Sequence, residues 1–289
     1  MSEKLYRFAG LELSLSAPEE MLYETELWLE PFVTDRVEDP HRYTLHRSET
    51  LPVPEGDCVS LSANGRIYEN SGKWMRYLGA EGGDPEKAVL CSVHEGKNHA
   101  VFLSGRIYRG DLKVSTVLDG LDINHLILRN RSVILHASFI EWEGKAVLFT
   151  APCQTGKSTQ AQLWKDLRRA EIINGDRGVI RISQDQILAE GLPFCGSSGH
   201  SRNRSLPLTA IVLLDQAPVT TIRRLQGYEA FAAVWSGLTM DRGNRADLDL
   251  ASQTVETIVG RIPVYHMPCT PDEEAVNVLE QELRKQGEL

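Results

Sequence analysis

Short stretches in which apolar and polar residues alternate dominate residues 1–112. Residues 11–16 (LELSLS) alternate strictly, which is the pattern of a half-buried β-strand. Shorter apolar runs follow, separated by Gly, Pro, Asn and Asp residues typical of turns; the runs are residues 58–62, 66–68, 88–93 and 100–103. We therefore predict a twisted antiparallel sheet in a β-rich N-terminal domain, and substrate recognition is our hypothesis for its role.

Longer elements that alternate between helix and strand begin at residue 113. We expect a helix at residues 115–128 and a strand at residues 132–136 that ends at His136. Residues 141–144 predict a hairpin turn into a buried strand at residues 145–150. From Ser158 onward we expect a helix, with its apolar surface supplied mainly by Ala161, Leu163, Trp164 and Leu167.

The rest of the chain continues this alternation. We expect a strand at residues 171–175, a hairpin with arms at residues 179–182 and 186–190, a central buried strand at residues 208–214, and helices at residues 226–240 and 247–261. Residues 270–273 (TPDE) read as a capping box with Pro271 at the first helical position, opening a helix that places Ala275, Val276, Leu279 and Leu283 on one face. The fold class we predict is α/β (α+β), with a second domain at residues 113–289.

Composition narrows the function classes. The 289 residues are 42% hydrophobic and 25% charged, as in ordinary globular proteins, and the net charge of −9 argues against nucleic-acid or anionic-membrane partners. No apolar run is long enough for a membrane span, and charges near the start argue against a signal peptide. The five scattered cysteines form no C-x-x-C pair, so we expect free thiols and a cytoplasmic protein.

The turn between the strand at residues 145–150 and the following helix has the spacing of a phosphate-binding loop (P-loop). It fits G-x-x-x-x-G-K-[ST], except that alanine occupies the first glycine position. Backbone N–H groups and the positive end of the helix dipole converge at such a turn and bind anions. We therefore expect nucleotide phosphates to be bound by Ala151, Pro152, Cys153, Gln154, Thr155, Gly156, Lys157, Ser158 and Thr159.

Three of these residues have specific expected roles. Lys157 would reach the β- and γ-phosphates, the Oγ of Ser158 would bind Mg²⁺, and Gly156 would let the backbone approach the phosphate. The alternative is an ordinary strand–turn–helix without a ligand.

A carboxylate follows the next strand. Asp176 is the candidate for the second oxygen ligand that a magnesium–phosphate site needs near the loop hydroxyl. The alternative is that Asp176 only initiates a turn before Gly178.

A loop rich in Gly, Ser and Arg spans residues 191–204. We expect Gly196, Ser197, Arg202 and Arg204 to bind substrate, because guanidinium groups can hold phosphate or carboxylate with two hydrogen bonds; solvated positions are the alternative. For four other histidines we favour structural or solvated positions. His41 and His46 are expected in a loop, and His94 and His99 on either side of Gly96 in a hairpin.

Taken together, these motifs resemble the HPr kinase/phosphorylase and phosphoenolpyruvate (PEP) carboxykinase group. The resemblance covers residues 130–285 and is strongest for the smaller HPr-kinase-like serine kinases, including kinases that modify lasso-peptide precursors. Four features carry it: His136 closing a strand, a hairpin leading to the GKST loop, Gly175-Asp176 after the next strand, and the Gly-Ser-rich loop at residues 196–199 before the strand PLTAIVLL.

The resemblance implies a PEP carboxykinase/HPr kinase-type P-loop core with an unusual strand order, ATP and Mg²⁺. In carboxykinases the histidine that matches His136 binds a divalent metal, so the expected metal ligands are Ser158, Asp176 and His136. The chain departs from the family in having one carboxylate (Asp176) followed by Arg177, and in having Thr159 where HPr kinases have glutamate. Whether Asp176 is a general base, a metal ligand or both stays open.

These features predict an ATP- and Mg²⁺-dependent kinase. Asp176, His136 and Lys157 are the expected catalytic residues, and the acceptor is a hydroxyl, either a serine of a peptide or protein or a small-molecule alcohol. The N-terminal half does not resemble that of HPr kinases, so HPr is not the expected acceptor. The chain is too short for a carboxykinase, and a homo-oligomer is left open by the resemblance. The competing hypothesis is a catalytically silent nucleotide-binding sensor or scaffold.

Overall fold

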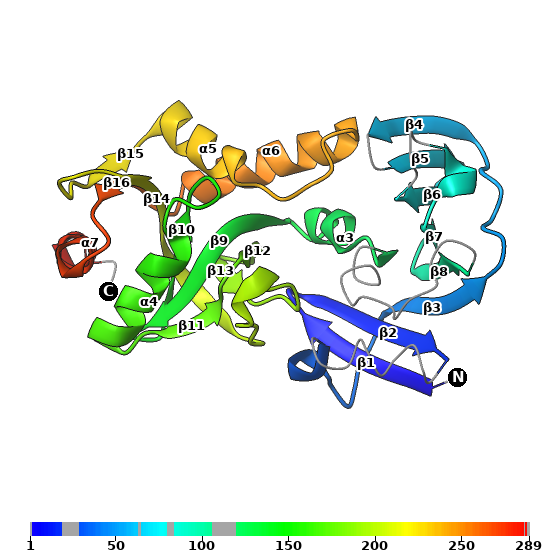
Figure 1. The fold of residues 1–289 in the computed structure, drawn as a ribbon, viewed down its shortest axis with the longest axis horizontal. Coiled ribbons are helices and arrows are strands. Elements are labelled where there is room, and N and C mark those ends of the chain that lie inside the picture. The colour runs from blue at the N-terminus through cyan, green and yellow to red at the C-terminus, as the bar shows by residue number, and fades with distance from the viewer. Residues whose placement is uncertain are drawn as a thin grey trace. The chain divides into compact units, whose positions relative to one another are not determined.

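The computed structural model describes residues 2–18, 29–62, 65–79, 84–105, 120–285 and 287. The chain divides into two compact units (Figure 1). Unit 1 comprises residues 1–126 and 241–247, and unit 2 comprises residues 127–240 and 248–289. The expected domain boundary between residues 112 and 113 lies outside the described residues.

Unit 1 is built on an eight-stranded sheet with the order β1-β2-β3-β8-β7-β6-β5-β4. The β-rich prediction is thus confirmed. In chain order its strands are β1 (Ser2–Phe8), β2 (Leu11–Ala17), β3 (His41–Ser48), β4 (Asp57–Ser62), β5 (Gly65–Asn70), β6 (Lys73–Leu78), β7 (Leu90–Glu95) and β8 (Asn98–Ser104), with 3-10 turns η1 (Glu30–Phe32) and η3 (Pro85–Lys87).

The expectation of an entirely antiparallel sheet is wrong. Strand β3 pairs in parallel with both β2 and β8. Short turns, such as the one at Ser71 and Gly72, join the antiparallel hairpins, whereas the segments between β2 and β3 and between β3 and β8 are long enough to return the chain in the same direction.

Three histidines form a hydrogen-bonded chain on one face of this sheet. Nδ1 of His41 lies 2.9 Å from Nε2 of His99, whose Nδ1 lies 2.9 Å from Nδ1 of His94. The other ring nitrogen of His94 lies 2.9 Å from Oγ of Ser92. His94 and His99 lie in the expected hairpin, but both are buried, and His41 and His46 lie in strand β3 and not in a loop.

Unit 2 contains one eight-stranded sheet with two long strands, β9 (Ser132–Trp142) and β14 (Ser205–Gln216), each of which pairs with different neighbours along its length. The first part of β9 pairs with β12 (Arg177–Ser183), and its second part pairs with β10 (Lys145–Thr150) and β11 (Glu171–Asn174). Strand β14 pairs first with β13 (Gln186–Glu190) and then, in parallel, with β10 and β16 (Val264–Cys269). Strand β15 (Arg223–Leu225) lies at the edge beyond β16.

Helices cover unit 2 in two groups (Figure 1). Helices α4 (Lys157–Arg168) and α7 (Glu273–Lys285) pack against β10, β14 and β16 through a cluster centred on the fully buried Trp164. Helices α5 (Gly227–Ser236) and α6 (Arg245–Val259) contribute to a second cluster with β9, β12 and β13. Helix α3 (Ile123–Arg129) precedes β9. None of the described helices combines the length and apolar character that spanning a bilayer requires.

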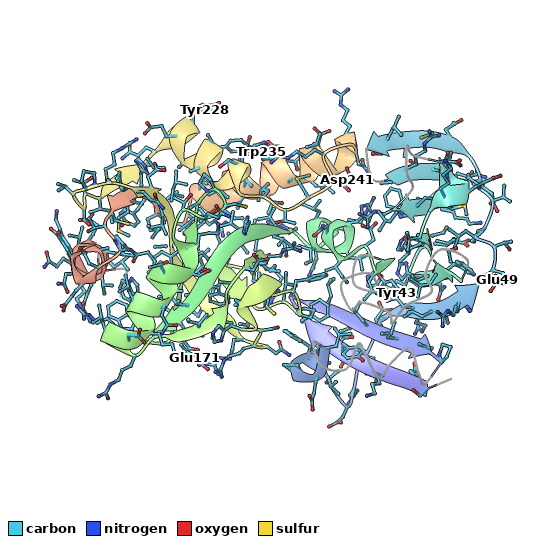
Figure 2. All side chains as sticks on the ribbon, viewed as in Figure 1. Tyr43, Glu49, Glu171, Tyr228, Trp235 and Asp241 are labelled. Carbon is cyan, nitrogen blue, oxygen red and sulfur yellow. The ribbon has the colours of Figure 1, made fainter. Side chains whose placement is uncertain are left out.

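Most expected elements of unit 2 are confirmed, with shifts at their ends. Strand β9 does not end at His136 but continues to Trp142, because its second half pairs with both β10 and β11. Helix α5 ends at Ser236, earlier than expected, and Tyr228 in its first turn is 83% exposed (Figure 2). The expected helix at residues 115–128 is described only from residue 120, and α3 begins at Ile123.

Two details of the helix predictions need correction. In α4 the buried polar residue Gln160 takes part in the inner face, whereas Leu167 is 37% exposed. Helix α7 buries the four expected residues, but its first turn is capped by Asp272, whose Oδ1 accepts from the N–H of Glu274. Thr270, the expected cap, instead hydrogen-bonds to Thr220.

Candidate functional site

A tight hairpin leads the chain into the loop at residues 151–156, the candidate phosphate-binding loop. Glu143 and Gly144 both have positive φ (50° and 77°), as a type I′ turn requires, and they join β9 to β10 in antiparallel register. This confirms the hairpin expected at residues 141–144. Strand β10 is paired on both sides and ends at Thr150, so the loop that follows starts from a fixed point.

The loop closes over the N-terminus of α4. Gly156 is the residue before the helix and has φ 112°, a conformation that favours glycine, and a Cβ placed there would meet nothing within 4 Å. Nζ of Lys157 donates to the carbonyl oxygens of Ala151 (3.0 Å) and Pro152 (3.2 Å). Burial lowers the pKa of Lys157, while the charge of Asp176 partly opposes that shift. The loop therefore leaves open space at Gly156, beside the buried amine of Lys157, which two carbonyl oxygens hold in place.

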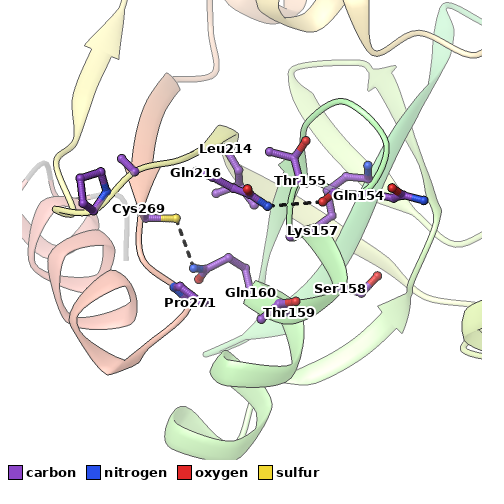
Figure 3. A pocket seen from close by; sticks show the side chains of 13 residues that line it. Gln154, Thr155, Lys157, Ser158, Thr159, Gln160, Leu214, Gln216, Cys269 and Pro271 are labelled. Atoms are coloured by element: carbon purple, nitrogen blue, oxygen red, sulfur yellow. Dashed lines mark hydrogen bonds between the residues drawn. The ribbon is translucent and has the colours of Figure 1, made fainter.

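Two pockets of unit 2 meet at the first turn of α4. The wider pocket has a volume of about 720 Å³ and is lined by residues 154–160, residues of the segment 214–218, Cys269 and Pro271 (Figure 3). The narrower pocket has a volume of about 340 Å³. Most of its lining residues are polar or small, and they come from β9, α4, β11 and the loops after β11 and β13: Ser138, Ser158, Ala161, Gln162, Ile172, Gly175, Asp176, Cys195, Ser198 and His200. Ser158 lines both pockets.

Asp176 occupies the narrower pocket in a fixed orientation. Its backbone N–H donates to Oδ1 of Asn174, and its carbonyl accepts from the N–H of Ala137. One carboxylate oxygen lies 3.4 Å from Nε2 of His136, and the other lies 3.2 Å from Nε of Arg177. Its side chain is 28% exposed, so the carboxylate is both held and accessible.

Two glycines allow the 3-10 turn η4 (Gly196–Ser198) to close on Asp176. A Cβ at Gly196, which has φ 55°, would lie 2.8 Å from Cγ of Asp176. A Cβ at Gly175 would lie 2.3 Å from Oγ of Ser198. The Gly-Ser-rich loop therefore forms one wall of the narrower pocket directly against the carboxylate.

His136 lies on β9 beside Asp176. Its backbone N–H donates to the carbonyl of Gly237, and its carbonyl accepts from Oγ1 of Thr150, the last residue of β10. Burial, followed by the charge of Lys157, lowers the pKa of His136, and Asp176 opposes this shift only in part. The imidazole is therefore predominantly neutral at neutral pH and can accept a proton.

Of the four expected substrate-binding residues, the two arginines are not brought to the pockets. Arg202 pairs with Glu171, and Arg204 pairs with Glu141 through contacts of 2.6–3.2 Å; neither arginine is among the residues that line the two pockets. Gly196 contacts Asp176, as described above. Ser197 lies in η4, and its side chain is outside what the structure describes.

Several residues that line the two pockets were not predicted from the sequence. Ser138 lies in β9 two residues after His136, so the H-x-S spacing was the available signal. Ser198 and His200 belong to the Gly-Ser-rich loop, but nothing in their pattern separates them from Ser197. Gln160, Gln216 and Cys269 line the wider pocket and come from three elements that are far apart in sequence.

The oxygen donors of the site fit magnesium. Ser158 and Asp176 both line the narrower pocket and offer hydroxyl and carboxylate oxygens, the ligand types Mg²⁺ prefers. Within the described ranges there is no group of three or more His, Cys, Asp or Glu residues arranged to hold a metal ion. Mg²⁺ in nucleotide sites commonly uses one or two protein oxygens and completes its shell with phosphates and water, so this donor set suffices.

Comparisons with known proteins give similar solved structures and one matching family. No match was found among curated proteins. Among solved structures, the Hpr(Ser) kinase/phosphatase from Coxiella burnetii matches with 11% sequence identity and a TM-score of 0.32, over 53% of this chain and 93% of that chain. Similarity at this level does not establish an activity. Residues 113–284, more than half of the chain, match the sequence profile of the SynChlorMet cassette protein ScmC, and the chain therefore belongs to the ScmC family.

Proposed function

We propose that the chain is an ATP- and Mg²⁺-dependent kinase that transfers a phosphoryl group to a hydroxyl. The acceptor we favour is a serine of a peptide or protein, and a small-molecule alcohol is the alternative within the same reaction class. The observation that carries the proposal is that Ser158 lines both the wider pocket at the phosphate loop and the narrower pocket that holds Asp176. A phosphate donor in the wider pocket and an acceptor in the narrower pocket would thus both lie against the side chain of Ser158.

The phosphate loop supports the donor side. The open space at Gly156, the backbone N–H groups that begin α4 and the amine of Lys157 form a cationic cradle for a polyphosphate. The present hydrogen bonds from Lys157 to the carbonyls of Ala151 and Pro152 keep the amine within the loop. When bound, Mg²⁺ would neutralise charge on the phosphates, with Ser158 and Asp176 as its protein ligands.

The narrower pocket supports the acceptor side. Its volume of about 340 Å³ matches a single side chain or a small alcohol better than a whole nucleotide, and Ser138, Ser198 and His200 add polar groups around Asp176. As the acceptor oxygen bonds to the γ-phosphorus, the bond from that phosphorus to the bridging oxygen would break and ADP would leave. Asp176 would take the proton of the acceptor hydroxyl in this step, and neutral His136 beside it would share that role. Lys157 would stabilise the charge that develops during transfer.

The test is phosphoryl transfer from γ-labelled ATP in the presence of Mg²⁺. The purified chain is incubated with serine-containing peptides and with a pool of small alcohols, and the labelled products are identified by mass. We expect transfer by the wild type and a loss of at least about a hundredfold in Lys157→Ala. Equal product formation by the two proteins would contradict the proposal.

One observation favours a second candidate, a nucleotide-binding sensor without catalysis. Asp176 is the single carboxylate at this position, and Arg177 holds one of its oxygens at 3.2 Å. Calorimetry of a sensor would show binding of ATP and Mg²⁺ that is weakened by Lys157→Ala. No acceptor would yield a labelled product. The same samples therefore separate the two candidates.

A further inference from the structure

We propose that the wider pocket contains a base subsite for an adenine ring, whose edge is recognised by the carboxamides of Gln160 and Gln216. The inference rests on the proposed function, because it names the nucleoside whose phosphates the loop would hold. It assigns specificity to two residues outside the GKST motif.

The position of the subsite follows from the sheet. Strands β10, β14 and β16 are parallel neighbours, so their carboxyl ends meet at one edge. The segments that leave these ends supply the pocket: residues 154–160 after β10, the end of β14 with residues 217–218, and Cys269 with Pro271 at the end of β16. Ligands of α/β sheets characteristically bind outside the carboxyl ends of the strands.

The pocket is chemically asymmetric. Lys157 is the only charged residue among those that line it, and it lies at the phosphate loop. Leu214, Ala217, Pro218 and Pro271 provide apolar surface, and Figure 3 shows Cys269 and Pro271 on the other side of Gln160 from Lys157 and Ser158. One end therefore suits phosphates, and the opposite end suits an uncharged planar ring.

The carboxamide of Gln160 is buried and incompletely bonded. The residue is 2% exposed, and its Nε2 donates only to the Sγ of Cys269 at 3.5 Å, a weak acceptor (Figure 3). Its Oε1 is buried without a hydrogen-bond partner among the described residues. A buried amide oxygen without a hydrogen bond costs free energy. A ligand that donates a hydrogen bond to this oxygen would recover that cost.

Gln216 adds a second carboxamide at the same end of the sheet. It is the last residue of β14 and is exposed, and its Nε2 reaches the carbonyl of Gln154 at 3.5 Å, the outer limit of a hydrogen bond. This weak contact leaves the side chain free to exchange the loop carbonyl for a ligand.

The chemistry of a carboxamide favours adenine. An amide offers one donor and one acceptor side by side, which match the adjacent ring nitrogen and amino group of adenine. At the edge where adenine carries N7 and its amino group, guanine presents two neighbouring acceptors, N7 and O6. These suit a side chain with two donors such as arginine, and no arginine is among the residues lining the wider pocket. We therefore expect ATP to bind more tightly than GTP.

The experiment measures binding of Mg²⁺-ATP, Mg²⁺-GTP and Mg²⁺-tripolyphosphate to the full chain by calorimetry. The variants are Gln160→Met, Gln216→Met and, as a matched control, Gln253→Met, an exposed glutamine in α6. We expect the wild type to prefer ATP over GTP about tenfold or more, and each pocket variant to lose most of that preference. Binding of tripolyphosphate should be the same in all four proteins.

Each outcome has one meaning. Equal affinities for ATP and GTP in the wild type, or an unchanged preference in both pocket variants, would overturn the base subsite while leaving the phosphate loop intact. Failure of every ligand to bind, tripolyphosphate included, would overturn the proposed function as well. Because Gln216 is exposed, its variant should fold even if Gln160→Met does not, which melting curves of each protein would establish.

Discussion

Nε2 of His136 lies 3.4 Å from Oδ1 of Asp176, and the two residues come from separate elements, β9 and the turn after β11. The N–H of Ala137 donates to the carbonyl of Asp176, so the backbone holds the two side chains beside each other. A carboxylate beside a predominantly neutral imidazole is a pair that can accept a proton from a substrate hydroxyl.

Replacement of Asp176 by asparagine keeps the shape and removes the charge. If the carboxylate takes the proton, kcat should fall about 10²–10⁴-fold while ATP affinity changes little. If it mainly holds the metal, the Mg²⁺ concentration required for half-maximal turnover should rise instead. Steady-state kinetics over a Mg²⁺ titration distinguishes the two roles, and unchanged kcat at every Mg²⁺ concentration would exclude both.

The protonation state of His136 predicts an acid limb in the pH profile. Burial and Lys157 lower its pKa from the ordinary value of 6.5, so the imidazole stays neutral down to pH values below 6.5 and becomes charged only in more acidic solution. Activity that depends on the neutral ring should therefore persist at pH 6.5 and fall below it. In His136→Gln, kcat should be lower, and the acid limb should be absent from the pH profile of kcat/KM. An identical pH profile in the wild type and the variant would contradict a catalytic role for His136.

Gly196 and Gly199 form a matched pair for testing the loop against Asp176. Both have positive φ (55° and 69°), so alanine introduces similar backbone strain at each, roughly 1 kcal/mol. Only at Gly196 does the added Cβ meet the carboxylate; at Gly199 it meets nothing within 4 Å.

We expect Gly196→Ala to reduce kcat by an order of magnitude or more, with little change in ATP binding, and Gly199→Ala to retain turnover. Thermal melting of both variants controls for the shared strain. Equal turnover in the two variants would mean that the wall formed by η4 does not position Asp176.

The histidine chain of unit 1 predicts loss of stability in acid. Burial lowers the pKa of His94 and of His99 to about 3, whereas an unfolded histidine has a pKa of about 6.5. The folded state thus prefers the neutral rings, and their contribution is complete above pH 6.5 and is lost as the pH falls from 6.5 toward 3. The slope is at most about 1.4 kcal/mol per pH unit for each histidine.

Urea unfolding of the full chain between about pH 7 and pH 5 measures this slope. His94→Gln removes one titrating group and should reduce the slope. His46→Gln, on the same sheet but outside the hydrogen-bonded chain, should leave it unchanged. A slope that is equal in all three proteins would show that the buried histidines do not control the acid response.

The predictability of the site differs between its parts. The strand, the glycine turn and the helix around the candidate phosphate loop were predictable because every determinant is local: an apolar run, a glycine and a helix start within 24 residues, Lys145–Arg168. The same holds for the hairpin of β9 and β10, whose turn residues are adjacent. The contact between Gly196 and Asp176 was outside the reach of sequence patterns, because it depends on how a loop twenty residues later folds back.

Burial of polar residues was the second feature that the sequence did not predict. Periodicity predicts which apolar residues face inward, and in α7 it selected the four buried positions. It cannot predict that Gln160 is buried in α4 or that His94 and His99 lie inside a sheet, because those positions depend on partners from distant strands. Similarly, the parallel pairing of β3 depends on connections whose path local residues do not determine.

The most direct measurement is a crystal structure of the chain with Mg²⁺ and a non-hydrolysable ATP analogue. We predict that the phosphates lie against the backbone amides around Gly156 and the amine of Lys157, with the metal ion between Ser158 and Asp176. An empty phosphate loop, or a metal-bound nucleotide from which Asp176 points away, would contradict the proposed function.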